Sequence, residues 1–181
     1  MKTVKTYLGI GSNLGKRGEN IRDAMLNLER WGVKILRSSS LYETEPVGLE
    51  DQPWFYNMVV LAETGMSPEE LLKVISAIEM AMGRERTAAD DKSVTGGTEP
   101  GEVRRGRVYG SRPIDIDILF YGDEVVEIPG LTIPHPRIAE RNFVLVPLAE
   151  IAAGFVHPVL KKSVGELLKG CGDNAIVKPI S

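Results

Sequence analysis

Residues 111–120 read SRPIDIDILF, and this stretch decides the fold because it places two carboxylates inside an apolar strand pattern. Its isoleucines alternate with Asp115 and Asp117, and alternate residues of a strand point to opposite faces. We therefore predict a buried strand over 114–120, with the isoleucines against helices and both aspartates on the other face. Aspartate is uncommon in strands, and a buried charge without a partner is strongly unfavourable, so the pair needs compensation.

A bound cation is one way to compensate the pair. The two carboxylates would lie about 7 Å apart along one strand face, where they repel each other unless a cation lies between them. Oxygen ligands with open positions suit Mg²⁺, which keeps several waters and is commonly completed by substrate phosphates. Two alternatives stay open at this point, namely a solvated sheet face and aspartates paired with arginines.

Arginines gather on the N-terminal side of the aspartate strand. Arg104, Arg105, Arg107 and Arg112 follow one another with no acidic residue between them, and Arg84 and Arg86 stand at the other end of the same segment. Mg²⁺ and arginine together hold and polarise polyphosphates. The pattern predicts a polyphosphate site, and a solvated loop with arginines for solubility is the alternative.

The rest of the chain predicts an α+β domain. Apolar residues recur at helical spacing over 17–31 and 67–83, where Ser67, Pro68 and Glu70 begin a helix with a capping box. The order β-α-β-β-α-β predicts a ferredoxin-like sandwich, an antiparallel sheet with helices packed on it and added C-terminal elements. The other predicted elements are strands over 3–11, 33–44 and 57–64, a hairpin at the Gly-Asp turn in 121–125, and a short helix over 142–152 interrupted at Pro147.

Composition limits the classes of function. The 181 residues suit one domain, 1–181, with a long flexible loop at about 88–106 that we expect to close over a bound triphosphate. A net charge of -3 argues against a nucleic-acid or anionic-membrane binder. The N-terminus has no secretory signal pattern, and no run reaches the ~18 apolar residues of a membrane span. The single cysteine, Cys171, fits a reducing compartment, so we expect a cytoplasmic protein.

Two further segments admit more than one interpretation. The glycine-rich residues 8–15 lack the third glycine of a dinucleotide loop and the Gly-Lys-Ser/Thr of a P-loop, so we interpret them as a strand-to-helix turn. The aromatic residues of 44–57 could stack a flat heterocycle whose edge Asn57 reads, or they could serve core packing. His135 could contact phosphate or belong to a turn.

Four segments together resemble one family, the 6-hydroxymethyl-7,8-dihydropterin pyrophosphokinases of folate biosynthesis. They are GIGSNLG near the start, LYETEPVGLEDQPWFYN in the middle, GSRPIDIDILF, and LTIPHPRIAERNFVLVPLAEI after it. The resemblance implies a ferredoxin-like core that transfers pyrophosphate from MgATP to the hydroxymethyl group of a reduced pterin and releases AMP. It also implies small-molecule substrates, no nucleic acid, no membrane, and a monomer or weak homo-oligomer.

The resemblance also implies roles for individual residues. Asp115 and Asp117 resemble ligands of two Mg²⁺ ions, and with Arg84 and Arg112 they form the catalytic set. The nucleotide contacts that it implies are Glu79, Arg84, Arg112, Ile118, Thr132, His135 and Arg141, and the pterin pocket is Thr44, Pro46, Val47, Phe55, Asn57 and Phe143, with Phe55 and Phe143 sandwiching the ring.

Two features depart from the family pattern. Pro136 follows His135 where members often have an aromatic residue, and the loop over 88–106 is longer than expected, so its basic residues have no one-to-one match. A two-metal phosphodiesterase or nuclease, and a binding module without catalysis, are the competing hypotheses.

Overall fold

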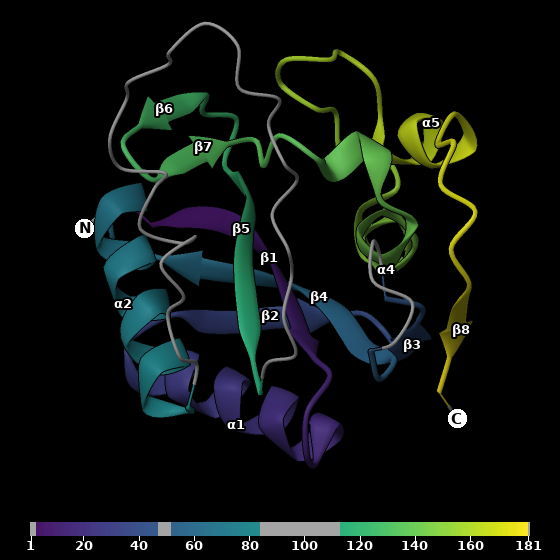
Figure 1. Cartoon of the computed structure of the whole chain (residues 1–181). Helices are drawn as coiled ribbons and strands as arrows, with labels where there is room; N and C mark the ends of the chain where they lie inside the picture. Colours follow the sequence, from purple (N-terminus) through teal and green to yellow (C-terminus); the bar gives the residue numbers. More distant parts are fainter. Residues whose placement is uncertain (1–2, 47–51, 84–112, 181) are drawn as a thin grey trace, which may run out of the picture.

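The structure is a computed structural model that describes residues 3–46, 52–83 and 113–180. Its centre is an antiparallel sheet in the order β5-β1-β4-β3-β8, with β2 also paired to β4 (Figure 1). The strands of this sheet are β1 (Val4–Ser12), β2 (Lys34–Ser38), β3 (Tyr42–Thr44), β4 (Phe55–Thr64), β5 (Asp115–Tyr121) and β8 (Val177–Pro179).

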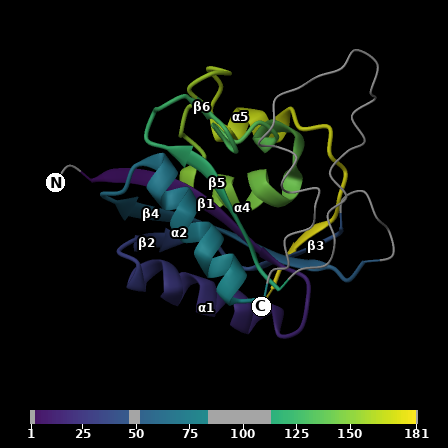
Figure 2. The same cartoon turned by 60° about the vertical axis from the view of Figure 1, so that its left-hand side comes forward.

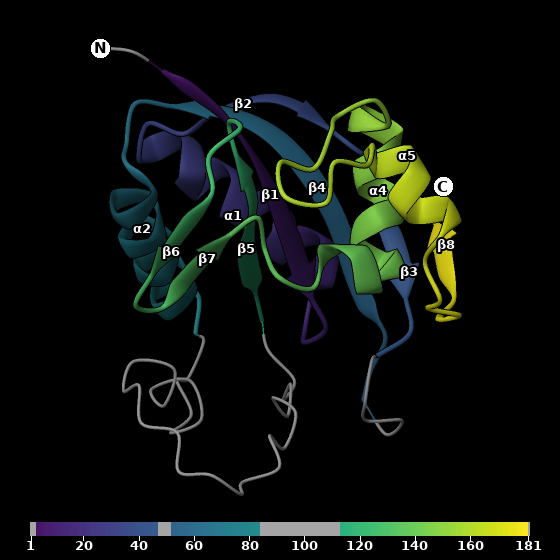
Figure 3. The same ribbon diagram turned by 90° about the horizontal axis from the view of Figure 1, so that it is seen from above.

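Helices cover both faces of the sheet. Figures 2 and 3 show α1 (Arg17–Arg30) and α2 (Pro68–Ala81) on one side, and α4 (Asn142–Ala152) and α5 (Val164–Lys169) on the other. A 3-10 turn, η1 (Ile138–Glu140), precedes α4. Each face therefore has its own apolar core. The first contains Leu8, Ile10, Ile21, Leu28, Val60, Leu71, Ile75 and Ile116, and the second contains Val59, Phe120, Ile138, Leu145, Leu148 and Val164.

The predicted ferredoxin-like order is confirmed, and local chemistry explains the clearest helix. At the start of α2 the Glu70 amide donates to Ser67 Oγ at 3.2 Å, and the Ser67 amide donates to Glu70 Oε2 at 2.8 Å. Two of the amides that a helix N-terminus leaves without partners are thus satisfied. Gly83 follows the helix with φ +90°, a backbone conformation that favours glycine.

The predicted strand over 33–44 is two strands. β2 pairs with the C-terminal half of β4 and β3 with its N-terminal end, so both lie along the same edge of β4. Ser39 separates them, yet it stays attached to β4, because its amide donates to the Val59 carbonyl at 2.9 Å and its Oγ accepts the Val59 amide at 3.0 Å. The edge of β4 thus stays hydrogen-bonded between β2 and β3.

Two other predictions are wrong in detail. The Gly-Asp turn at 122–123 does not fold β6 (Val126–Ile128) back on β5; β6 pairs with β7 (Leu131–Ile133) in a separate two-stranded sheet. The helix over 142–152 is continuous, with Pro147 inside it. Among the described residues, no helix is both long and apolar enough to cross a membrane.

Candidate active site

The aspartate pair lies on β5, an edge strand of the main sheet. Ile116 and Ile118 are each 5% exposed and pack in the core beneath α1 and α2. Asp115 and Asp117 alternate with them and are half-buried, so both carboxylates belong to the opposite face of the sheet. The predicted division of the strand into an apolar face and a carboxylate face is confirmed.

Two glycines on β1 stand opposite the two aspartates. Gly9 pairs with Asp117 and Gly11 with Asp115, and paired residues of neighbouring strands point to the same face. β1 itself therefore contributes no side chains beside the carboxylates at these two positions. This corrects the interpretation of 8–15 as a turn, because β1 continues through Ser12 and the turn follows it, with Gly15 at φ +61°.

Gly11 also connects the aspartates to an amide on the next strand. Gly11 pairs with Asn57 on β4, so Asp115, Gly11 and Asn57 form one row across three strands. A Cβ at position 11 would lie 2.5 Å from Asn57 Oδ1, closer than nonbonded heavy atoms approach. The glycine is thus required for the observed place of the Asn57 amide.

Asn57 is held in a fixed orientation. Its side chain is 8% exposed, and Nδ2 donates to Thr44 Oγ1 at 2.7 Å; Thr44 is 1% exposed. Phe55 lies two residues earlier on β4, so it shares the face of Asn57, and its ring approaches the Gly11 position to 3.9 Å. These three side chains form one wall of a site beside the aspartates.

The first turn of α4 belongs to the helical layer that covers the same face. Arg141 precedes the helix and is 4% exposed, and its guanidinium carbon lies 5.4 Å from the centroid of the Phe143 ring. Residues of α4 pack in the second core together with Val59 of β4, and Val59 shares the face of Asn57. Phe143 thus stands on the aspartate side of the sheet.

Two side chains from the other helical layer anchor β5. Glu79 of α2 is 6% exposed, and its Oε1 accepts the amide of Ile116 at 2.9 Å, between the two aspartates. Asn20 of α1 donates through Nδ2 to the Pro113 carbonyl at 3.2 Å and the Leu14 carbonyl at 2.9 Å. These bonds fix the start of β5 against the end of β1.

The segment after β7 runs beside β5. The His135 amide donates to the Leu119 carbonyl at 3.0 Å, and His135 Nδ1 accepts the Arg137 amide at 3.2 Å. Thr132 is exposed on β7. Since Leu119 is two residues beyond Asp117, this segment brings His135 to the strand that carries the aspartates.

Comparison with known proteins identifies the family. The family model described as 7,8-dihydro-6-hydroxymethylpterin-pyrophosphokinase (HPPK) matches residues 7–153. The chain belongs to the HPPK family. The 2-amino-4-hydroxy-6-hydroxymethyldihydropteridine pyrophosphokinase of Bacillus subtilis (strain 168) is 42% identical over 146 residues, which cover 80% of this chain and 76% of that protein. The protein of the same name from Aquifex aeolicus (strain VF5) is 37% identical over 166 residues, 92% of this chain and 90% of that protein.

Several relatives are much longer. The chain spans 21% of the folic acid synthesis protein fol1 of Pneumocystis carinii, with 39% identity over 174 residues that cover 96% of this chain. It spans 24% to 27% of three plant folate synthesis bifunctional proteins. Among solved structures, wild-type Plasmodium falciparum HPPK-DHPS with pteroate superimposes with a TM-score of 0.68 at 19% identity, over 93% of this chain and 42% of that chain. The fold is therefore the HPPK fold.

Some residues assigned by resemblance to HPPK lie outside the described residues. They are Val47, Arg84 and Arg112. The predicted loop at 88–106 and the arginines at 104, 105 and 107, which have no one-to-one match in the family, also lie outside the described residues. The described residues on the two sides of 84–112 lie close together, because a Cβ at Gly83 would lie 3.9 Å from Pro113 Cγ. Arg84 and Arg112 are the next residues along the chain from this contact.

The remaining residues differ in how directly they can serve an HPPK site. The Ile118 side chain is buried in the core, so any contact with a nucleotide must come from its main chain. Glu79 is engaged with the Ile116 amide, a positioning contact that spacing alone did not indicate. Pro46 is half-buried directly after Thr44 and Glu45.

The carboxylate pair fits a magnesium site of the open kind. Within 3–46, 52–83 and 113–180 no three His, Cys, Asp or Glu side chains gather closely enough to enclose a metal. Mg²⁺ is typically held by one or two carboxylates, with waters and substrate phosphates completing its shell. Two half-buried carboxylates on one face of β5, opposite Gly9 and Gly11 of β1, match that arrangement.

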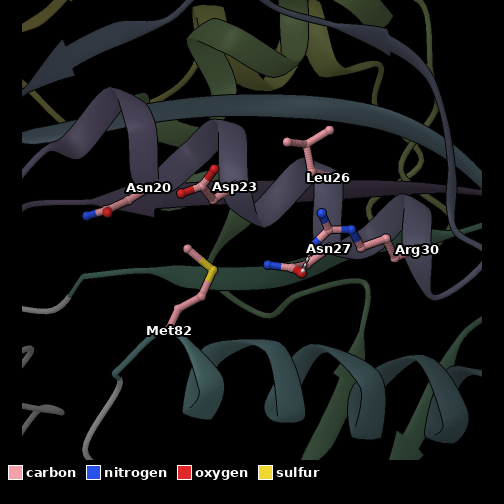
Figure 4. Close-up of a pocket in the computed structure, with 6 residues that line it drawn as sticks. All are labelled: Asn20, Asp23, Leu26, Asn27, Arg30 and Met82. Carbon is pink, nitrogen blue, oxygen red and sulfur yellow. Dashed lines mark hydrogen bonds between the residues drawn. The ribbon is translucent and has the colours of Figure 1, made fainter.

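A groove of about 460 Å³ lies between α1 and α2 (Figure 4). Its lining includes Asp23, Asn27 and Arg30 of α1 and Met82 at the end of α2. These helices cover the sheet face opposite the aspartates, so the groove does not belong to the HPPK site.

Proposed function

We propose that this chain is an ATP-dependent pyrophosphokinase that transfers pyrophosphate from ATP to the hydroxymethyl group of 6-hydroxymethyl-7,8-dihydropterin in folate biosynthesis. The observation that carries the proposal is the row Asp115–Gly11–Asn57, which combines a carboxylate and a buried amide on one sheet face of an HPPK family member. The reaction needs such a combination, because a charged triphosphate and a flat heterocycle must meet.

The pterin side of the site is the wall around Asn57. Phe55 and Phe143 would stack on the two faces of the ring. Asn57 would bind the ring edge, since an amide offers both a donor and an acceptor. Thr44 accepts a hydrogen bond from Asn57 Nδ2 at 2.7 Å, and this bond sets the orientation of the amide toward the ligand. Pro46 and Val47 complete the proposed pocket.

The nucleotide side is the aspartate strand and its neighbours. Asp115 and Asp117 would hold two Mg²⁺ ions, which when bound supply charge stabilisation to the triphosphate. Arg84, Arg112 and Arg141 would contact phosphate oxygens, and Glu79, Ile118, Thr132 and His135 would complete the nucleotide site.

The chemistry requires positioning rather than a protein nucleophile. The hydroxymethyl oxygen of the pterin attacks the β-phosphorus of ATP, and the bond from that phosphorus to the oxygen shared with the α-phosphorus breaks. The products are the pterin diphosphate, AMP and the proton of the attacking hydroxyl. The residues of this chain act by aligning the hydroxyl with the bond that breaks and by excluding other orientations.

The proposal extends to the compartment and the oligomeric state of the protein. A single domain over 1–181, with one cysteine, suits a cytoplasmic monomer or weak homo-oligomer. Light scattering coupled to size exclusion measures the mass of the particle directly.

The test of the function is AMP formation from MgATP, with and without the hydroxymethyl pterin. We expect AMP only when the pterin is present. Hydrolysis of nucleic acid or of ATP alone would favour a two-metal phosphodiesterase, and pterin binding without AMP would favour a binding module.

A further inference from the structure

The chain does not end where the HPPK family match ends. The match stops at residue 153, whereas the structure continues through α5 and then through residues 173–180, which we call the C-terminal tail. Figure 1 shows the tail leaving α5, passing α4 and ending beside β3. Figure 3 shows β8 next to β3 from a second direction. The tail therefore returns to the pterin side of the site.

The first contact of the tail is with the start of α4. Asp173 Oδ2 accepts the Asn142 amide at 2.8 Å, and Asn142 Nδ2 donates to the Asp173 carbonyl. Asp173 Oδ1 also accepts the Ala175 amide at 2.9 Å, which fixes the carboxylate. A carboxylate at a helix N-terminus is stabilised by the free amides and the helix dipole. Asn142 directly precedes Phe143, so this contact holds the stacking ring.

The second contact is with the opposite wall. Val177 pairs with Thr44 and Lys178 with Glu43 on β3. The Ile176 amide donates to Glu45 Oε2 at 2.8 Å, and the Glu45 amide donates to the Ile176 carbonyl at 3.1 Å. Thr44 orients Asn57, so these bonds hold the wall of the pocket whose amide is proposed to bind the edge of the pterin ring.

We propose that the C-terminal tail is a brace that sets the spacing between the two walls of the pterin site, with Asp173 as its positioning residue. The inference rests on the proposed function, because it concerns the same pocket. A flat ring stacked between two others needs them about 7 Å apart, twice the ~3.5 Å of carbon contact. Only two residues, 174 and 175, lie between Asp173, which bonds α4, and Ile176, which bonds Glu45 after β3, so the tail restricts this distance. Loss of the brace should weaken pterin binding and leave nucleotide binding unchanged.

The test compares Asp173→Ala and Asp173→Asn with Asp123→Ala. Asp123 is exposed in the turn after β5, so it is a matched control. We would titrate each full-length protein with a fluorescent pterin in the presence of a non-hydrolysable ATP analogue, and with the analogue alone. We expect Asp173→Ala to raise the pterin Kd about tenfold, equivalent to about 1.4 kcal/mol. The Kd of the analogue should stay within about twofold. Asp173→Asn keeps one acceptor oxygen and should recover part of the loss.

A chain ending at Gly172 should show the same selective loss of pterin affinity, or a larger one. If Asp173→Ala binds pterin as tightly as Asp123→Ala does, the brace is refuted while the proposed function stands. Parallel loss of analogue binding would also refute it, because a general structural defect would affect both ligands. If the unaltered protein neither binds the pterin nor forms AMP with it, the proposed function fails and the brace fails with it.

Discussion

Replacing Gly11 with alanine should damage the pterin site through a single added carbon. The new Cβ would lie 2.5 Å from Asn57 Oδ1, so one of the two must move. Asn57 is buried and its Nδ2 is bound to Thr44, so the amide cannot turn away without breaking that bond. Overpacking costs ~1–3 kcal/mol, and the smaller entropy of the unfolded chain offsets ~0.4–1 kcal/mol. We expect the free energy of unfolding to fall by about 1–2 kcal/mol.

The effect on pterin affinity should be at least as large as the effect on folding. An edge hydrogen bond left unmade in a buried site costs ~1–3 kcal/mol, which corresponds to an increase in Kd of about 5- to 150-fold. Titration with a fluorescent pterin and denaturant unfolding measure the two quantities.

A matched control lies two residues away. A Cβ at Gly9 would meet the Leu119 side chain at 3.6 Å, an ordinary contact, so Gly9→Ala should leave the unfolding free energy unchanged or raise it slightly. The clash at position 11 should also disappear when Asn57 is shortened. In the Gly11→Ala background, Asn57→Ala should therefore cost less stability than it does alone. If Gly11→Ala binds pterin normally, or if the two substitutions are additive, the role assigned to Gly11 is wrong.

Two further predictions concern Glu79 and His157. Glu79→Ala should leave the Ile116 amide without its acceptor and cost ~1–3 kcal/mol of unfolding free energy, and it should lower turnover because the aspartates flank that amide. Glu79→Gln keeps an acceptor, so it should retain most of the stability and most of the turnover. Equal behaviour of the two variants would contradict this prediction. Burial lowers the pKa of His157, so below about pH 6.5 the unfolded chain binds a proton more readily than the folded chain does. The free energy of unfolding should therefore fall from pH 7.5 to 5.5. It should fall less in His157→Asn, which keeps an acceptor for the amides of Val159 and Leu160. Equal losses in both proteins would exclude His157 as the cause.

The features predicted correctly are those determined by neighbours in the sequence. The capping box of Ser67 and Glu70 is complete within four residues, and the alternation over 114–118 assigns the faces of the first part of β5. Such patterns depend only on the period of a helix or strand. Beyond Ile118 a register shift places the adjacent Leu119 and Phe120 in the second core, which alternation does not predict.

The features that were missed depend on register between distant segments. Gly9 and Gly11 matter because β1 pairs with β5, more than a hundred residues later, with Gly11 opposite Asp115. The two glycines are two residues apart, as the two aspartates are, and this equal spacing is the sequence feature that could have indicated their pairing. The hairpin at 122–123 is wrong although the Glu124 amide donates to the Tyr121 carbonyl at 3.1 Å within the turn, because β6, the next strand, pairs with β7 and not with β5. β8 has three residues and pairs at an edge, so it leaves no periodic pattern.

The central claim is that the carboxylate pair serves the transfer of two phosphates as one unit. The most direct measurement is ³¹P NMR of the products formed from MgATP and 6-hydroxymethyl-7,8-dihydropterin by the unaltered protein and by Asp115→Asn and Asp117→Asn. We predict AMP and pterin diphosphate in equal amounts from the unaltered protein, and loss of most product from both variants with the fold retained, because each variant loses several kcal/mol of charge stabilisation. Formation of ADP, AMP without pterin diphosphate, or near-normal turnover by both variants would contradict the account.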